Sequence, residues 1–173
     1  FASLALLAKV APILYSPEYM RSDDFGHFWA SGKLFITKGN PYDLDTLISI
    51  QVDAGASETS QNSIQSQTLN PPWALLILSP FSLLNYSTAR ILWLISNISL
   101  IVISVRFLWI ILHGSSNKRG FALLVTFCFT PVYSVLTKGQ VTPWVVIGTT
   151  MVLLYSEGII NSWWAGIGLM LIS

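Results

Sequence analysis

The apolar run from Ile91 to Leu112 is the feature that most constrains what this chain can fold into. It holds a single charged residue, Arg106, near one end. About 20 mostly apolar residues are enough for a helix to cross a hydrocarbon core about 30 Å thick. A long basic side chain near the end of such a helix can extend to the membrane interface. We therefore predict a membrane-spanning helix over residues 91–112, with Arg90 anchoring it at the interface.

The charge content agrees with a membrane environment. Only 10% of the residues are charged, whereas soluble domains carry roughly 25%. A net charge of +1 provides no long-range field for nucleic acid. The single cysteine, Cys128, excludes both a disulfide framework and a cysteine-based zinc site. We expect a membrane protein with no nucleic-acid partner, no metal and no cofactor.

Other apolar segments extend this prediction to an all-α, polytopic transmembrane helical bundle of roughly four to six membrane helices. Because the chain begins without Met and starts and stops inside apolar runs, we expect it to be part of a longer polytopic protein. Six Trp residues are assigned to the interface belts. The further predicted spans are 1–15 (the end of a first span), 121–137, 141–156 and 158–173, and the belt residues are Trp29, Trp73, Trp93, Trp144, Trp163 and Trp164.

The segment 71–84 is apolar but too short to cross. Its residues reach about 21 Å as a helix, and it contains Pro80. We predict a re-entrant or interfacial helix. The short basic loop 113–120 belongs in the cytoplasm by the positive-inside rule, and the long loop 16–70, in which acidic residues outnumber basic ones, belongs outside.

The loop 16–70 concentrates the polar side chains of the chain. We predict a helix that Ser22 or Asp23 caps, with Asp24 in its first turn and Gly39 closing it after Lys38. The sequence from Asn40 to Asp43 predicts a turn, with Asp43 capping a second short helix that runs to about Val52. Residues 53–69 lack periodicity and predict a mobile lid or a disordered insert.

One face of the first of these helices carries the candidate chemistry. Asp24, His27 and Phe28 lie at i, i+3 and i+4 and therefore share a face. A carboxylate at the membrane surface beside a histidine can act as a general base toward a hydroxyl group. The alternative is that Asp23 and Asp24 only begin a helix and that His27 is solvated. Spacing alone leaves both interpretations open.

Several short motifs occur in an order that resembles glycosyltransferase family 87. They are Asp24–Gly32 (DFGHFWASG), Gly39–Asp43 (GNPYD), Asn70–Pro72 with the later Pro80, and Gly139–Gln140. The family consists of polytopic GT-C enzymes typified by polyprenyl-phosphate-mannose-dependent mannosyltransferases. The resemblance implies a GT-C fold, a first external loop that carries the catalytic Asp, a polyprenyl-phosphate sugar donor, and transfer with inversion to a lipid or glycan acceptor. It also implies a multi-pass protein, in the cytoplasmic membrane if bacterial, with an extracytoplasmic active site.

Roles for individual residues follow from this resemblance. Asp24 takes the role of general base, with the adjacent Asp23 as the alternative. The substrate-binding candidates are His27, Lys33, Tyr42, Asp43 and Gln140. Each has a structural alternative: solvated loop cations or lipid-headgroup contacts for His27 and Lys33, a turn for Tyr42 and Asp43, and a helix start for Gln140. The absence of a Gly-x-Gly-x-x-Gly motif agrees with a donor that is not a nucleotide.

Two other classes of protein compete with this interpretation. A transporter or channel subunit could use proline-interrupted segments, such as 71–84 and the one containing Pro131, as broken helices. Against it, the predicted spans contain almost no charged residues that could relay ions. A noncatalytic membrane scaffold would tolerate changes throughout the external loop.

Overall fold

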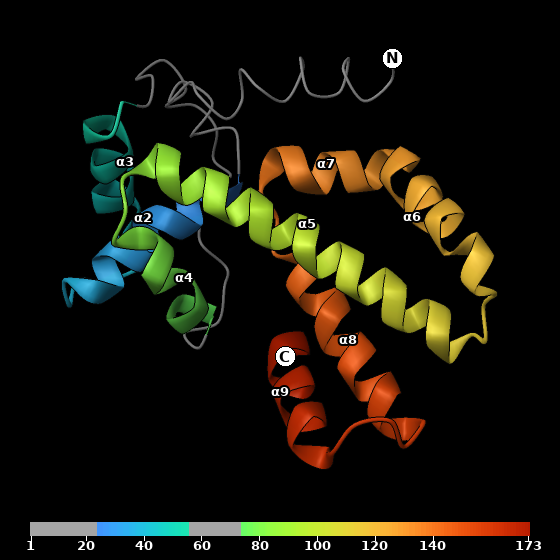
Figure 1. The fold of residues 1–173 in the computed structure, drawn as a ribbon. Helices are drawn as coiled ribbons and strands as arrows, with labels where there is room; N and C mark the ends of the chain where they lie inside the picture. Colours follow the sequence, from blue (N-terminus) through green and yellow to red (C-terminus); the bar gives the residue numbers. More distant parts are fainter. Residues whose placement is uncertain (1–23, 56–73) are drawn as a thin grey trace. The chain divides into compact units, whose positions relative to one another are not determined.

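The computed structural model describes residues 24–55 and 74–173, and within these ranges the chain is all-α, as predicted. Predictions for 1–15, Ser22, Asp23, the part of 53–69 after residue 55, and Asn70 to Trp73 lie outside the described residues. The elements are α2 (Asp24–Ile36), α3 (Leu44–Asp53), α4 (Ala74–Ser82), α5 (Tyr86–Ile111), η3 (Ser116–Lys118), α6 (Arg119–Cys128), α7 (Thr130–Lys138), α8 (Thr142–Ser156) and α9 (Ser162–Ile172) (Figure 1).

The chain divides into two compact units. The first runs to Trp93 and includes Thr137–Gly139, and the second comprises Leu94–Leu136 and Gln140–Ser173. Helix α5 contributes its first two turns to the first unit and the remainder to the second.

Helix α2 organises the first unit by packing against α3 and α4. Phe25 and Trp29, four residues apart, are buried on the same face of α2. Gly32 continues this face, and a Cβ there would lie 3.0 Å from the Cβ of Ser82 on α4. The indole nitrogen of Trp29 donates to the carbonyl oxygen of Leu84 at 3.1 Å. The small residue thus allows the two helices to approach closely.

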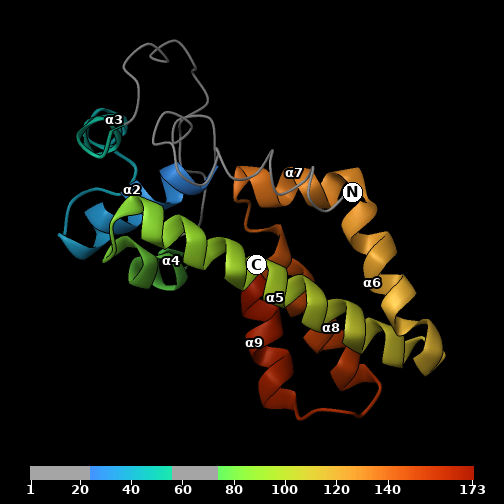
Figure 2. The same cartoon turned by 45° about the horizontal axis from the view of Figure 1, so that its top comes forward.

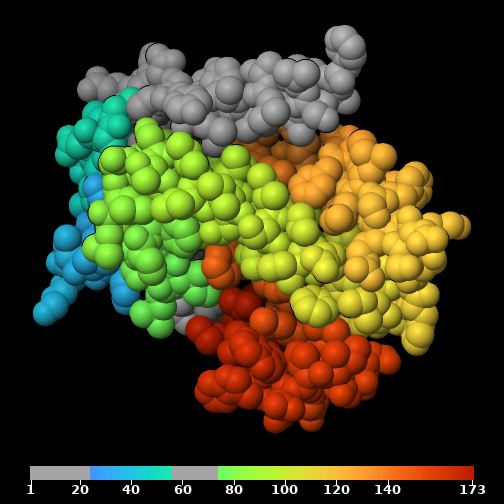
Figure 3. Space-filling model, in the orientation of Figure 1, coloured from blue at the N-terminus to red at the C-terminus, as the bar shows by residue number. Residues whose placement is uncertain are grey.

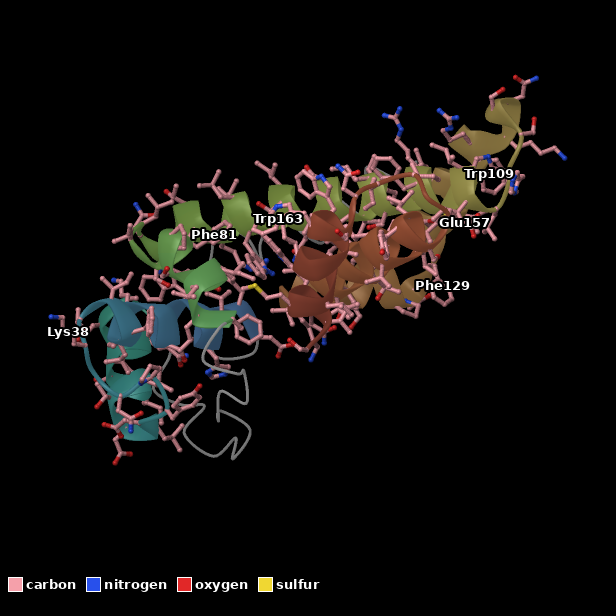
Figure 4. All side chains as sticks on the ribbon, turned by 90° about the horizontal axis from the view of Figure 1, so that it is seen from below. Lys38, Phe81, Trp109, Phe129, Glu157 and Trp163 are labelled. Carbon is pink, nitrogen blue, oxygen red and sulfur yellow. The ribbon has the colours of Figure 1, made fainter. Side chains whose placement is uncertain are left out.

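Helix α2 ends in a Schellman motif, but its left-handed residue is Lys38, with φ 59°, and not Gly39 as predicted. The amide of Gly39 donates to the carbonyl of Leu34 at 2.8 Å, and that of Lys38 donates to Phe35 at 3.2 Å. A Cβ on Gly39 would lie 3.0 Å from the Leu34 side chain. The glycine therefore provides room for a close contact, and the lysine makes the turn. Figure 4 shows the Lys38 side chain directed away from the ribbon.

The predicted turn after α2 is confirmed. The backbone amide of Tyr42 donates to the Asn40 side-chain oxygen at 3.1 Å, and that of Asp43 donates to the Asn40 carbonyl at 3.1 Å. Asp43 occupies the N-cap position of α3, as predicted, with φ −76° and ψ 104°. Its carboxylate makes no capping bond to a backbone amide and instead accepts the hydroxyl of Thr46 at 2.5 Å.

Helices α4 and α5 lie where helices were predicted over 71–84 and 91–112, but their bounds differ. The nine residues of α4 include Pro80 and extend only about 14 Å, which is too short for a crossing. Helix α5 has 26 residues, and its most apolar 18-residue window has a mean hydropathy of 2.1 and is 17% buried. It starts five residues earlier than predicted because Asn85 caps it, with its side-chain oxygen accepting the amide of Thr88 at 2.9 Å.

The segment 121–137, predicted as one span, forms two helices, α6 and α7, with a break between them. The segments Ser116–Cys128 and Thr130–Lys138 are bent by 64° (Figure 2). Phe129 is extended at the break, and Pro131, which lacks an amide hydrogen, lies where a new helix can begin. Among the described residues, one helix is long and apolar enough to cross a membrane, or two if this bent pair counts as a span. The predicted four to six spans are therefore not confirmed.

Helices α8 and α9 form a tightly packed pair in the second unit (Figure 1). The predicted helix 141–156 matches α8, whereas the predicted helix 158–173 shortens to the eleven residues of α9. A Cβ on Gly148 would lie 2.7 Å from the carbonyl oxygen of Gly168, and the reverse distance is 2.6 Å. The two backbones are thus in mutual contact, and Figure 3 shows the atoms of residues 142–173 packed against one another.

Candidate functional site

The candidate site begins where α2 begins. Asp24 is the first residue of α2 and is half-buried. The next residue, Phe25, is fully buried. Its ring stacks on Trp93 at a centroid distance of 5.3 Å and contacts Tyr86 at 6.0 Å. This aromatic packing fixes the start of α2 and with it the backbone of the candidate base.

Gly139 packs directly against this aromatic group. Its φ is +67°, a conformation that L side chains rarely adopt. A Cβ at this position would lie 2.6 Å from the Cβ of Phe25 and 3.1 Å from the guanidinium carbon of Arg90. The indole nitrogen of Trp93 donates to the Gly139 carbonyl at 2.8 Å. The residue after Asp24 and the residue before Gln140, far apart in sequence, are therefore neighbours in the fold.

Arg90 is buried and does not anchor α5 at an interface as predicted. Only 1% of its surface is exposed, and its guanidinium donates to the carbonyl of Thr137 at 2.6 Å. The same group lies 5.7 Å from the centre of the Phe25 ring. A buried cation is costly unless it is bonded, and a carbonyl near the end of α7 and the Phe25 ring provide two of its contacts.

Two of the predicted belt residues also lie in the core. Trp29 is 2% exposed and Trp93 is fully buried, whereas Trp163 is 75% exposed. Arg90 and Trp93 are three residues apart and share a helix face. That spacing is the sequence signal by which their common burial could have been found.

His27 is held by a residue that the sequence analysis missed. The amide nitrogen of Gln51 on α3 lies 2.9 Å from Nδ1 of His27. Because an amide nitrogen only donates, Nδ1 of His27 is the acceptor in this contact. Gln51 is 1% exposed and lies four residues after the buried Leu47. Because Gln51 shares a helix face with the apolar Leu47, the sequence could have indicated that this polar side chain is buried and needs a partner.

The other candidates in the first unit lie at separate places on α2 and the turn. The ammonium group of Lys33 lies 4.1 Å above the Trp29 ring, a cation–π contact. Tyr42 is 43% exposed, and Asp43 is exposed at the start of α3. Lys33 therefore packs over the Trp29 ring, and Tyr42 and Asp43 lie in the turn before α3.

Gln140 belongs to the second unit and has a backbone bonded on both sides. Its amide donates to the carbonyl of Val135 at 3.0 Å, which completes a Schellman motif with Gly139 as the left-handed residue. Its carbonyl accepts the side-chain amide of Asn97 at 3.1 Å. Gly139–Gln140 thus ends α7 as well as leading into α8, where only a helix start was predicted.

The chemistry open to Asp24 is that of a carboxylate. Asp24 lies in the first turn of α2, and its carboxylate can accept a proton from a hydroxyl group. Within residues 24–55 and 74–173, no group of three or more His, Cys, Asp or Glu side chains gathers that could hold a metal ion. Asp24 is therefore a potential base next to the buried aromatic side chain of Phe25.

Comparison with known proteins assigns the chain to a family. No curated protein and no solved structure matches it. A family model, that of glycosyltransferase family 87, matches residues 69–173, more than half of the chain. The matched range includes Asn70–Pro72, Pro80 and Gly139–Gln140, whereas Asp24–Asp43 lies before it. This match favours an enzyme over a transporter subunit or a scaffold, and the chain belongs to glycosyltransferase family 87.

Proposed function

We propose that this chain carries the catalytic base of a membrane glycosyltransferase that uses a polyprenyl-phosphate sugar as donor. The transferred group is a hexose of the mannose type, and the acceptor is a hydroxyl group of a lipid or glycan. The observation that carries the proposal is the contact of Gly139 with Phe25, because it joins the Asp24 motif to the part of the chain that matches the family.

The proposed reaction is a single displacement. The carboxylate of Asp24 takes the proton from the acceptor hydroxyl group while the hydroxyl oxygen attacks the anomeric carbon of the sugar. The bond from that carbon to the phosphate oxygen breaks, and the polyprenyl phosphate leaves with the electron pair. The proton remains on Asp24, and the configuration at the anomeric carbon is inverted. Asp23 is the alternative base.

Several features support the proposal. Asp24 is half-buried at a helix start that aromatic packing holds in place. Helix α5, which supplies Trp93 to that packing, is long and apolar enough to cross a membrane, and a lipid-linked donor partitions into the bilayer. We therefore assign the protein to the membrane as a multi-pass enzyme of the GT-C type, with the loop 16–70 and its active site on the extracytoplasmic face.

The remaining candidates take secondary roles in this proposal. His27, which Gln51 contacts at Nδ1, binds the donor phosphate. Lys33, which lies on α2 over the Trp29 ring, contributes positive charge to the same part of the site. Tyr42 and Asp43 shape the turn at the far end of α2, where more distant hydroxyl groups of a glycan acceptor can contact them. Gln140 hydrogen-bonds the substrate through its side-chain amide.

The test is the Asp24→Asn variant of the full chain in membranes, supplied with a panel of polyprenyl-phosphate sugars that includes the mannose compound. Loss of a positioned general base lowers turnover by about 10²- to 10⁴-fold, while protein accumulation should stay unchanged. The anomeric configuration of the product reports on inversion. Asp23→Asn in parallel identifies which of the two adjacent carboxylates is the base.

Asp45→Asn provides a matched control. Asp45 is also a first-turn acid of a helix, on α3, and it is exposed. Its replacement removes a similar helix-dipole interaction but no proposed base, so turnover should remain near the wild-type rate. Wild-type turnover in both Asp24→Asn and Asp23→Asn would exclude the proposed mechanism.

A further inference from the structure

Asn97 is a fully buried amide near the middle of α5, the most apolar helix of the chain. Its two polar atoms are both bonded within the second unit. The side-chain nitrogen donates to the carbonyl of Gln140, and the side-chain oxygen accepts the indole N–H of Trp144, each at 3.1 Å. Because burying an unbonded amide is costly, these two bonds fix the orientation of the side chain.

The two bonds hold both sides of the α7–α8 connection. Gln140 follows the end of α7, where carbonyl groups lose their helical partners. Trp144 is the third residue of α8. The backbone amide of Gln140 already donates to the Val135 carbonyl. The bond from Asn97 to the Gln140 backbone carbonyl therefore fixes the backbone of Gln140 on both sides.

The side chain of Gln140, unlike its backbone, makes no hydrogen bonds within the described ranges. The residue is half-buried, and its side-chain amide bonds to no residue in those ranges. The backbone bonds therefore determine where this side chain starts, and no described residue bonds its polar atoms. A residue of this kind is suited to binding a ligand through its amide.

We propose that Asn97 is a positioning residue that acts through Gln140 and sets the direction in which the Gln140 side chain meets the substrate. The proposal rests on the proposed function, in which Gln140 binds the donor or acceptor. Asn97 then serves substrate binding as well as stability. A residue with only a structural role would change stability without a specific effect at Gln140.

The first experiment measures the position of residue 140 without relying on activity. In a Cys128→Ser background, which removes the single cysteine, Gln140→Cys is labelled with a maleimide with and without Asn97→Leu. The reporter Ser116→Cys, at an exposed position in the polar loop after α5, is labelled in the same way. We expect Asn97→Leu to change the labelling rate at residue 140 at least threefold and to leave the rate at residue 116 unchanged. Equal changes at both positions, or none at residue 140, would overturn the proposal.

The second experiment measures transfer from polyprenyl-phosphate mannose, or from the panel member that supports turnover. Asn97→Leu should raise KM about three- to tenfold, the effect of one lost hydrogen bond, with a smaller change in kcat. Asn97→Gln, which keeps the amide, should restore part of the loss, and Ser99→Ala, an exposed change on α5, should have no effect.

A double variant tests whether the effect passes through Gln140. Added to Gln140→Ala, Asn97→Leu should raise KM no further, because the side chain that it positions is already absent. Additive increases would overturn the proposal. If the wild-type protein transfers no sugar from any donor, the proposed function fails, and the labelling result alone then decides whether Asn97 positions residue 140.

Discussion

Replacing Gly139 by alanine should destabilise the protein by more than its backbone conformation alone explains. The left-handed φ of +67° costs an L residue about 1–2 kcal/mol. The new Cβ would also lie 2.6 Å from the Cβ of Phe25 and 3.1 Å from the Arg90 guanidinium. Overpacking of this kind costs about 1–3 kcal/mol. We therefore expect a total loss of about 2–5 kcal/mol.

The Phe25 contact is the harder of the two to relieve. A Cβ is fixed to the backbone, so relief requires a movement of α2 itself, which begins at Asp24. The arginine side chain can shift by rotation of its bonds. If Gly139→Ala folds at all, it should therefore also lose turnover, because the candidate base moves with its helix.

Gly158→Ala is the control that isolates the contact. Gly158 has a φ of +70°, close to that of Gly139, but no atom lies within 4 Å of the point that its Cβ would occupy. Its replacement should cost about 1–2 kcal/mol. The effect of a glycine substitution on the unfolded chain is the same at both sites and cancels in the difference.

The assay is an equilibrium unfolding titration in detergent micelles, followed by tryptophan fluorescence. Gly139→Ala should lose about 1–3 kcal/mol more than Gly158→Ala. A difference between the two variants below about 0.5 kcal/mol, the range of an ordinary surface substitution, would show that Phe25 and Arg90 do not pack against Gly139.

Two further predictions can be tested in the same titration. Gly168→Ala should destabilise the α8–α9 pair by about 1–3 kcal/mol, because its Cβ would lie 2.6 Å from the backbone oxygen of Gly148. Gly166→Ala, on the same helix with no atom within 4 Å, should instead stabilise by about 0.5–1 kcal/mol; equal effects of the two changes would contradict the close packing. Lys38→Gly should stabilise by about 1 kcal/mol because it relieves a left-handed residue with φ 59°, whereas Lys38→Ala should be neutral, and a loss in Lys38→Gly would show that the lysine side chain itself supports the turn.

Local sequence patterns were sufficient for most helices. The apolar run after Ile91 predicted α5, and Asn40-Pro41 predicted the turn before α3. Both depend on interactions within a few residues, which the sequence displays directly. The missed start of α5 was also local, since Asn85 is a favourable capping residue.

The break between α6 and α7 was only partly visible in the sequence. Pro131 marked a place where a helix can stop or begin. The hydropathy of 121–137 nevertheless predicts one span, because composition carries no information on a change in the direction of the helix axis. The extended conformation of Phe129 and the 64° bend required the structure.

The candidate site divides in the same way. The ordered motifs pointed to Asp24, His27 and Gln140 and to the family that residues 69–173 then confirmed. The sequence could not supply the partner of His27, because Gln51 lies on another helix. The roles of Asp24 and Gln140 in transfer remain predictions.

By itself, the sequence determined that this chain is helical, that one helix is long enough for a membrane, and which family it belongs to. These properties follow from periodicity, run length and short motifs, all of which are local. Only the tertiary structure decided that Arg90 and Trp93 are buried and that Gly139 lies against Phe25. Burial depends on which segments meet in space, and a basic residue at the edge of an apolar run looks the same in sequence whether it faces the membrane interface or a backbone carbonyl.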